Sequence, residues 1–212
     1  DIRALSICGT VSDLACMGAK PKYLSCALVI EEGYPMDRLE QIAQAMADTA
    51  AEAGVTIVSG DTKVAGRGQA DGVFITTTGV GEILPGVETS GAMAAPGDAI
   101  IVTGDVGRHG CPILLARDDF GIDADVQSDC APLWDSVEAM LSVTKDIHVI
   151  RDATRGGVGT VLYEIAGQSH VGMEIQASKV PVDPAVRGVC GLLGLEPLYL
   201  ACEGAMVMIE VD

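Results

Sequence analysis

Apolar positions in the first part of the chain follow two different periods, which predict helices and strands in turn. They recur about every third residue over 2–17, as on the buried face of a helix, and alternate over 23–30, as in a strand. The elements predicted in this part are helices at 2–17 and 35–50 and strands at 23–30, 55–58 and 73–81, with a polar turn at 59–62. A Gly- and Pro-rich stretch at 85–97 then interrupts the pattern.

This interruption predicts a boundary between two units, 1–84 and 97–212. The second unit is expected to hold strands at 98–103, 147–151, 172–177 and 205–211 and helices at 110–118, 132–143, 156–167 and 184–193. Because helices and strands do not alternate strictly, an α+β fold with partly antiparallel sheets fits the pattern as well as a doubly wound fold does. The chain starts in a helical pattern without Met and stops after an apolar run, so we expect it to be part of a longer protein.

Charge and composition exclude several classes of protein. Thirteen Lys and Arg stand against 30 Asp and Glu, and aromatic residues make up 3% of the chain, which argues against nucleic acid as a partner. No apolar run reaches the roughly 18 residues of a membrane span. The seven cysteines are odd in number and form no C-x-x-C pair, which predicts buried, reduced thiols in a cytoplasmic protein.

Two polar groups in the first unit are candidates for metal or phosphate binding. The first follows the strand predicted at 55–58 and consists of Gly60, Asp61, Thr62 and Lys63. Carboxylate oxygens suit Mg²⁺ and a lysine ammonium suits phosphate, although a solvated polar turn is the alternative. The second is Asp13, which lies within an apolar helix and either caps a neighbouring group or binds a cation.

The second unit offers an anion site and two candidate proton carriers. The anion site is predicted where a strand leads into a helix, at Arg151, Asp152, Thr154, Arg155, Gly156 and Gly157. The alternative there is a simple N-cap made by Asp152 or Thr154. A weaker glycine-rich segment at 104–110 contains His109, whose alternative role is structural, and Glu203 is a candidate base unless it is an exposed turn residue. These residues predict an enzyme that handles a phosphorylated ligand.

Several motifs together resemble the HypE family of hydrogenase maturation factors. They lie at 8–15 (CGTVSDLA), 23–26 (YLSC), 31–33 (EEG), 60–64 (GDTKV), 151–157 (RDATRGG) and 184–190 (PAVRGVC), along essentially the whole chain. The family belongs to the superfamily of aminoimidazole ribonucleotide synthetase, selenophosphate synthetase and thiamine-monophosphate kinase. The resemblance implies a two-domain PurM-like α+β fold, with an N-terminal ATP-binding and dimerisation domain of mostly antiparallel sheet plus helices, and a second α/β domain. It also implies a homodimer that shapes the ATP clefts.

The activity that the resemblance implies is that of an ATP-dependent carbamoyl dehydratase of the lyase type. A carbamoyl group, delivered by HypF to a C-terminal cysteine, becomes a thiocyanate, and its cyanide passes to the HypC–HypD complex for the iron of [NiFe]-hydrogenase. On this basis we assign Asp13 and Asp61 to Mg²⁺ and the residues of 60–63 and of the anion site to ATP. Lys63, Glu203 and His109 are assigned to catalysis.

The sequence departs from the family pattern in three places. Ser12 stands where the family usually has Asn, and Cys202-Glu203-Gly204-Ala205 stands where it usually reads Asn-Glu-Gly-Lys. The family's N-terminal segment and its C-terminal tail with the acceptor cysteine are missing, so we expect this fragment to be impaired and assign no cysteine to that role. The alternatives are another ATP-using member of the superfamily, of the amidine synthetase or selenophosphate synthetase type, and a non-catalytic dimerisation or docking module.

Overall fold

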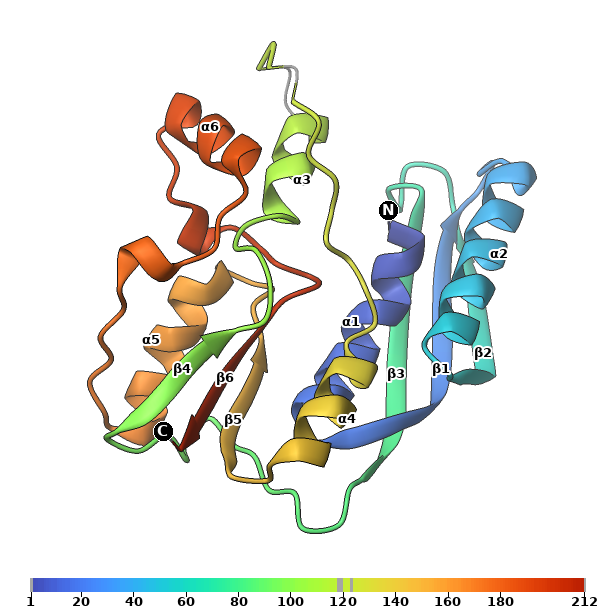
Figure 1. Cartoon of the computed structure of the whole chain (residues 1–212). Coiled ribbons are helices and arrows are strands. Elements are labelled where there is room, and N and C mark those ends of the chain that lie inside the picture. Colours follow the sequence, from blue (N-terminus) through green and yellow to red (C-terminus); the bar gives the residue numbers. More distant parts are fainter. Residues whose placement is uncertain (1, 118–119, 123, 212) are drawn as a thin grey trace.

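The computed structural model describes residues 2–117, 120–122 and 124–211 as two three-stranded sheets with helices packed against them (Figure 1). The elements are α1 (Ile2–Cys16), β1 (Ala19–Glu31), α2 (Met36–Glu52), β2 (Thr56–Ala65), β3 (Val73–Ile83), β4 (Asp98–Val102), α3 (Gly110–Arg117), α4 (Trp134–Val143), β5 (Ile147–Asp152), α5 (Gly157–Ser169), η1 (Ala177–Lys179), α6 (Pro184–Leu193), η2 (Pro197–Tyr199) and β6 (Met206–Val211). This mixture confirms the α+β class. No helix in the described ranges is long and apolar enough to cross a bilayer.

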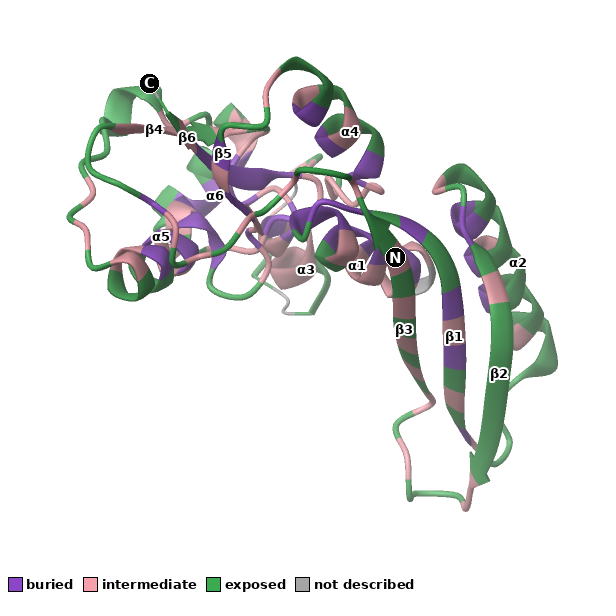
Figure 2. Ribbon diagram, turned by 90° about the horizontal axis from the view of Figure 1, so that it is seen from below, coloured by how far each residue is buried: buried purple, intermediate pink, exposed green. Residues whose placement is uncertain are grey.

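The first sheet has β1 at its centre, with β2 parallel to it on one side and β3 antiparallel on the other. Leu24 and Cys26 of β1 point toward α1 and α2 and are buried. Successive side chains of a strand point to opposite faces, so the neighbouring positions of β1 lie on the outer face. That outer face is largely exposed (Figure 2) and carries the apolar side chains of Tyr23, Phe74 and Val80, each at least half exposed.

The second sheet has the order β4-β6-β5, with both pairings antiparallel. The central strand β6 is buried on both of its faces. Val207 and Ile209 pack with α5, whereas Met206 and Met208 pack in the core that contains α1 and α4. The two-residue period of the strand therefore divides its side chains between two cores.

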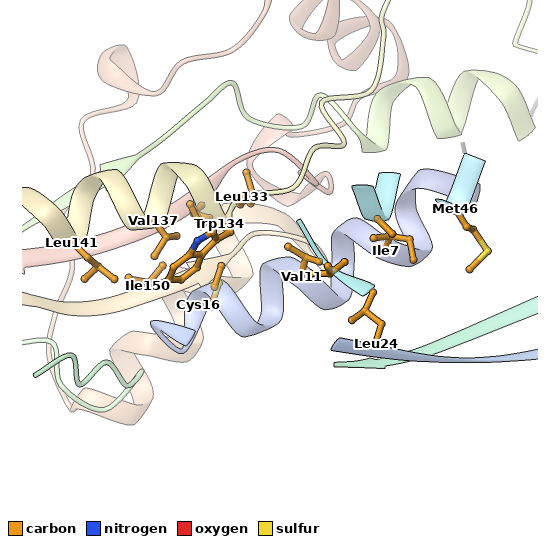
Figure 3. Close-up of a cluster of buried hydrophobic side chains, with 14 of the residues drawn as sticks. Ile7, Val11, Cys16, Leu24, Met46, Leu133, Trp134, Val137, Leu141 and Ile150 are labelled. Atoms are coloured by element: carbon orange, nitrogen blue, oxygen red, sulfur yellow. The ribbon is translucent and has the colours of Figure 1, made fainter. Parts of the chain in front are cut away.

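One hydrophobic core joins the two halves of the chain (Figure 3). Ile7 and Val11 of α1 lie in the same cluster as Trp134 and Val137 of α4 and Ile150 of β5, and all five are buried. Helix α1 thus contacts elements of both halves. Units 1–84 and 97–212 share this core, so the core does not separate them, and the boundary between them stays a prediction.

Two predicted elements were wrong. The turn expected at 59–62 is strand, because residues 59–65 continue to pair with β1 and their polar side chains remain in solvent at the edge of the sheet. The strand expected at 172–177 is irregular and leads into η1. Val171 and Met173 still pack against the core around α5, so their apolar alternation reflects side-chain contacts without strand pairing.

The cysteines agree with the sequence prediction. Six of the seven are buried, Cys130 is partly buried, and all are free thiols.

The shared core predicts that α4 stabilises the whole chain. Val137→Ala should lower the free energy of unfolding by about 1.5–3 kcal/mol, because Val137 is fully buried between the halves. Val143→Ala in the same helix should change it by less than about 0.5 kcal/mol, because Val143 is 86% exposed. Chemical denaturation of both variants tests this, and equal effects would contradict the shared core.

Candidate active site

A cavity of about 830 Å³ lies at the seam between α1 and the second half of the chain. Asp13 of α1 lines one side, and His109 and Gly110 line another at the start of α3. The remaining polar walls are residues of the β5–α5 connection and Glu203; from the connection these are Arg151, Asp152, Thr154, Arg155 and Gly156. The structure therefore brings together the predicted anion site, Asp13, His109 and Glu203.

The β5–α5 connection lines the cavity up to Gly156, directly before α5. Gly156 and Gly157 have φ angles of 72° and 63°, and a Cβ on Gly157 would lie 2.4 Å from the carbonyl oxygen of Leu198. Glycine is therefore required for this close turn. No side chain caps α5, because the Thr154 hydroxyl donates instead to Asp152 Oδ2 at 2.8 Å. The N-cap alternative was wrong, and a helix start without a side-chain cap is suited to bind an anion.

Two arginines supply positive charge next to this helix start. Arg155 is exposed at the cavity. Arg151 is partly buried and lies 3.5 Å from Glu164 and 3.8 Å from Asp152. A helix N-terminus flanked by guanidinium groups is suited to bind phosphate oxygens.

Glu203 is partly buried, so the exposed-turn alternative was wrong. Its backbone N–H donates to Asp129 Oδ1 at 3.1 Å, which holds the residue just before β6. Burial, reinforced by the negative charges of Asp152, Asp129 and Asp13, raises the pKa of Glu203 to about 7. A carboxyl group with this pKa exchanges a proton readily at neutral pH and is suited to general acid–base chemistry.

Asp13 faces the same cavity from the side of α1. Burial and the charge of Asp152 raise the pKa of Asp13, while Arg151 and Arg155 oppose that shift. The carboxyl groups of Asp13 and Asp152 and the hydroxyl of Thr154 line this cavity. Oxygen ligands of this kind are the ones that Mg²⁺ prefers.

A magnesium ion here would need further ligands. In the described part of the chain, no three His, Cys, Asp or Glu side chains are grouped closely enough to hold a metal ion. Phosphate and water oxygens commonly complete the coordination of Mg²⁺ in nucleotide sites.

His109 forms part of the cavity wall and is buried. Its Nδ1 atom lies 2.8 Å from the Ser128 hydroxyl, and burial lowers its pKa, which leaves the ring neutral at pH 7. The amides of His109 and Gly110 both donate to the carbonyl of Ala201, and that of Gly107 donates to Cys202 Sγ. These three amides are used in packing, so the structure does not favour a phosphate loop at 104–110.

The residues of 60–63 lie outside this cavity. Asp61 is paired with Ala27 and Lys63 with Val29, which places both side chains on the outer face of the first sheet. Helix α1, with Asp13, packs against the opposite face. A single chain therefore does not bring the two predicted magnesium ligands, Asp13 and Asp61, together.

Sequence reasoning missed two residues near the site, Ser128 and Asp129, which contact His109 and Glu203. They lie in the irregular stretch before α4, where no periodic pattern or motif marks them.

The raised pKa of Glu203 predicts a pH-dependent effect on stability. A pKa that is higher in the folded than in the unfolded state contributes stability below the unfolded value, near 4.5, and this contribution is lost as pH rises through about 7. Glu203→Gln should therefore gain in melting temperature relative to wild type between about pH 5 and about pH 8. The exposed Glu196→Gln is the control, and a difference independent of pH for Glu203→Gln would contradict the assignment.

Comparison with known proteins identifies the family. Residues 1–83 match the N-terminal domain of AIR synthase related proteins, and residues 95–211 match their C-terminal domain. The chain is 50% identical over 209 residues to the carbamoyl dehydratase HypE of Cupriavidus necator, covering 99% of this chain and 60% of that relative. It thus spans about 60% of the length of the curated relatives that it matches.

Solved structures agree with this match. A HypE crystal structure in complex with ATP superposes with a TM-score of 0.96 at 50% identity, covering 100% of this chain and 63% of that chain. A HypE–HypF complex superposes with a TM-score of 0.97 at 43% identity, covering 99% of this chain and 69% of that chain. The chain therefore belongs to the AIR synthase related protein family, with its PurM-like fold, and its similarity to HypE proteins confirms the resemblance carried by the sequence motifs.

Proposed function

We propose that a protein containing this chain dehydrates a carbamoylated cysteine to a thiocyanate at the expense of ATP, as a step in [NiFe]-hydrogenase maturation. The observation that carries this proposal is Glu203, whose pKa is raised to about 7 within the cavity that also contains the start of α5. A proton acceptor and a phosphate site are the two groups that such a dehydration requires. Similarity to proteins named carbamoyl dehydratase supports the choice of reaction.

The chemistry follows from the poor leaving ability of an amide oxygen. The carbamoyl oxygen attacks the γ-phosphorus of ATP, ADP leaves, and one N–H proton is lost. The C–O bond then breaks, phosphate leaves, and loss of the second N–H proton completes the C≡N bond. Glu203 accepts an N–H proton, while the α5 amides and Arg155 hold the phosphate. Magnesium, when bound, neutralises charge on the phosphates, and Asp13 and Asp152 are the cavity carboxylates that would hold it.

We further propose that the nucleotide site is completed in a homodimer. Asp61 and Lys63 share the outer face of the first sheet with exposed apolar side chains, including Tyr23, Phe74 and Val80. Pairing of two such faces would remove apolar surface from water and place these polar residues at an interface. At such an interface Lys63 would be available to contact phosphate, and Asp61 would be available as a magnesium ligand.

The proposed partners are HypF as the carbamoyl donor and the HypC–HypD complex as the cyanide acceptor, in the cytoplasm. The similarity to the HypE chain of a HypE–HypF complex supports the first partner.

The reaction is tested in a full-length protein that carries these residues, mixed with HypF, carbamoyl phosphate and ATP. Mass spectrometry should show a carbamoyl adduct on the terminal cysteine that then loses one water. Glu203→Gln should retain ATP binding but slow the water loss by about 10²–10⁴-fold, because the proton acceptor is removed. Exposed Glu196→Gln is the control. A near-normal rate for Glu203→Gln would refute its role, and no water loss in the wild type would refute the reaction.

Self-association is tested by light scattering at micromolar concentration. The wild type should be a dimer, and Phe74→Asp should be a monomer, because a charge would be placed in the apolar outer face. Leu192→Asp changes a more exposed apolar residue, on α6, and should leave the dimer intact. A monomeric wild type, or a dimeric Phe74→Asp, would contradict pairing through this face.

A further inference from the structure

Three successive residues before α4 each contact a different segment next to the cavity. Ser128 Oγ lies 2.8 Å from Nδ1 of His109, at the start of α3. Asp129 Oδ1 accepts the N–H of Glu203, before β6, at 3.1 Å. The thiol of Cys130 is hydrogen-bonded to that of Cys8 in α1. Residues 128–130 therefore link the two candidate proton carriers to each other and to α1.

The contact with Ser128 restricts the His109 ring. The hydroxyl oxygen already accepts the N–H of Cys130 at 3.1 Å, so its own O–H is available for donation to Nδ1. Since burial lowers the pKa of His109, the ring is neutral at pH 7 and carries one proton. Donation from Ser128 would hold that proton on Nε2 and fix the orientation of the ring.

The contact with Asp129 restricts the position of the Glu203 backbone. A Cβ on Gly204 would lie 1.9 Å from the Asp129 carbonyl oxygen, so the two backbones are packed directly against each other. Asp129 Oδ2 is buried and has no hydrogen-bond partner. Burying a carboxylate oxygen without a hydrogen-bond partner costs free energy. A neutral side chain could accept the same backbone N–H without that cost.

We propose that Ser128 and Asp129 are positioning residues that hold His109 and Glu203 in place at one cavity. Ser128 orients the His109 ring, and Asp129 holds the backbone of Glu203 so that its carboxyl group faces the β5–α5 connection. The catalytic consequence rests on the proposed dehydration, but the two contacts and their effects on His109 and Glu203 do not.

The first test needs no activity and uses NMR of this chain with ¹⁵N-labelled histidine at neutral pH. In the wild type, the His109 ring nitrogens should give the shifts of a single tautomer. Ser128→Ala should move these shifts toward a mixture of tautomers, whereas Ser142→Ala, an exposed serine on α4, should not. Unchanged His109 shifts in a folded Ser128→Ala would overturn the role of Ser128.

The second test follows the amide of Glu203. Asp129→Asn retains an oxygen acceptor, so the Glu203 amide should keep its proton shift and its protection from hydrogen exchange. Asp129→Ala removes the acceptor, so this amide should shift and exchange faster. Asp125→Asn, an exposed change in the same stretch, is the control. If Asp129→Ala fails to fold, loss of the Glu203 amide's protection in Asp129→Asn would by itself overturn the proposal, and its retention would support it.

The third test measures kinetics in the full-length protein. Asp129→Ala should lower kcat for water loss on the order of 10- to 100-fold with little change in KM for ATP, because a misplaced Glu203 affects the chemical step. Asp129→Asn should restore most of that loss. A wild-type kcat in Asp129→Ala, or an effect on KM alone, would overturn the catalytic consequence. Absence of water loss in the wild type would instead refute the proposed function, while the NMR results would still decide the positioning roles.

Discussion

The burial of α1 between the two halves of the chain is the interaction on which the rest of the structure depends. Ile7 and Val11 are fully buried in the core that also contains α4 and β5. A Cβ on Gly79 of β3 would lie 2.7 Å from Leu14, so the helix lies directly on the first sheet. This packing sets how the halves meet, and it places Asp13 of α1 across the seam from the β5–α5 connection.

Several carboxyl groups lie close together at this seam. Asp13, Asp152 and Glu203 line one cavity, and the charges of Asp13 and Asp152 add to burial in raising the pKa of Glu203. The same cavity is lined by Gly156, directly before α5, and by Arg155. A candidate phosphate site and a carboxyl group whose pKa is raised to about 7 are thus held side by side, and the proposed reaction depends on this pairing.

Most of the fold could be predicted from the sequence, because hydrophobic period reports which face of an element is buried. The prediction failed at 59–62, where a polar edge strand is held by backbone pairing alone, and at 172–177, where alternating side chains pack without pairing. The residues of 151–156, Asp13 and Glu203 were candidates from the sequence, and the structure places them around one cavity. Ser128 and Asp129 could not be found in this way, because they act through tertiary contacts that leave no local pattern.

The most direct test of this account is the titration of the Glu203 carboxyl group, followed by NMR of the chain with ¹³C-labelled glutamate. The account predicts a midpoint near pH 7 that falls when Asp152 is replaced by Asn, because burial and that neighbouring charge are its two largest causes. A midpoint near the ordinary value of 4.5 would show that the seam does not change the carboxyl group, and would contradict the assignment of Glu203 as the proton acceptor of this site.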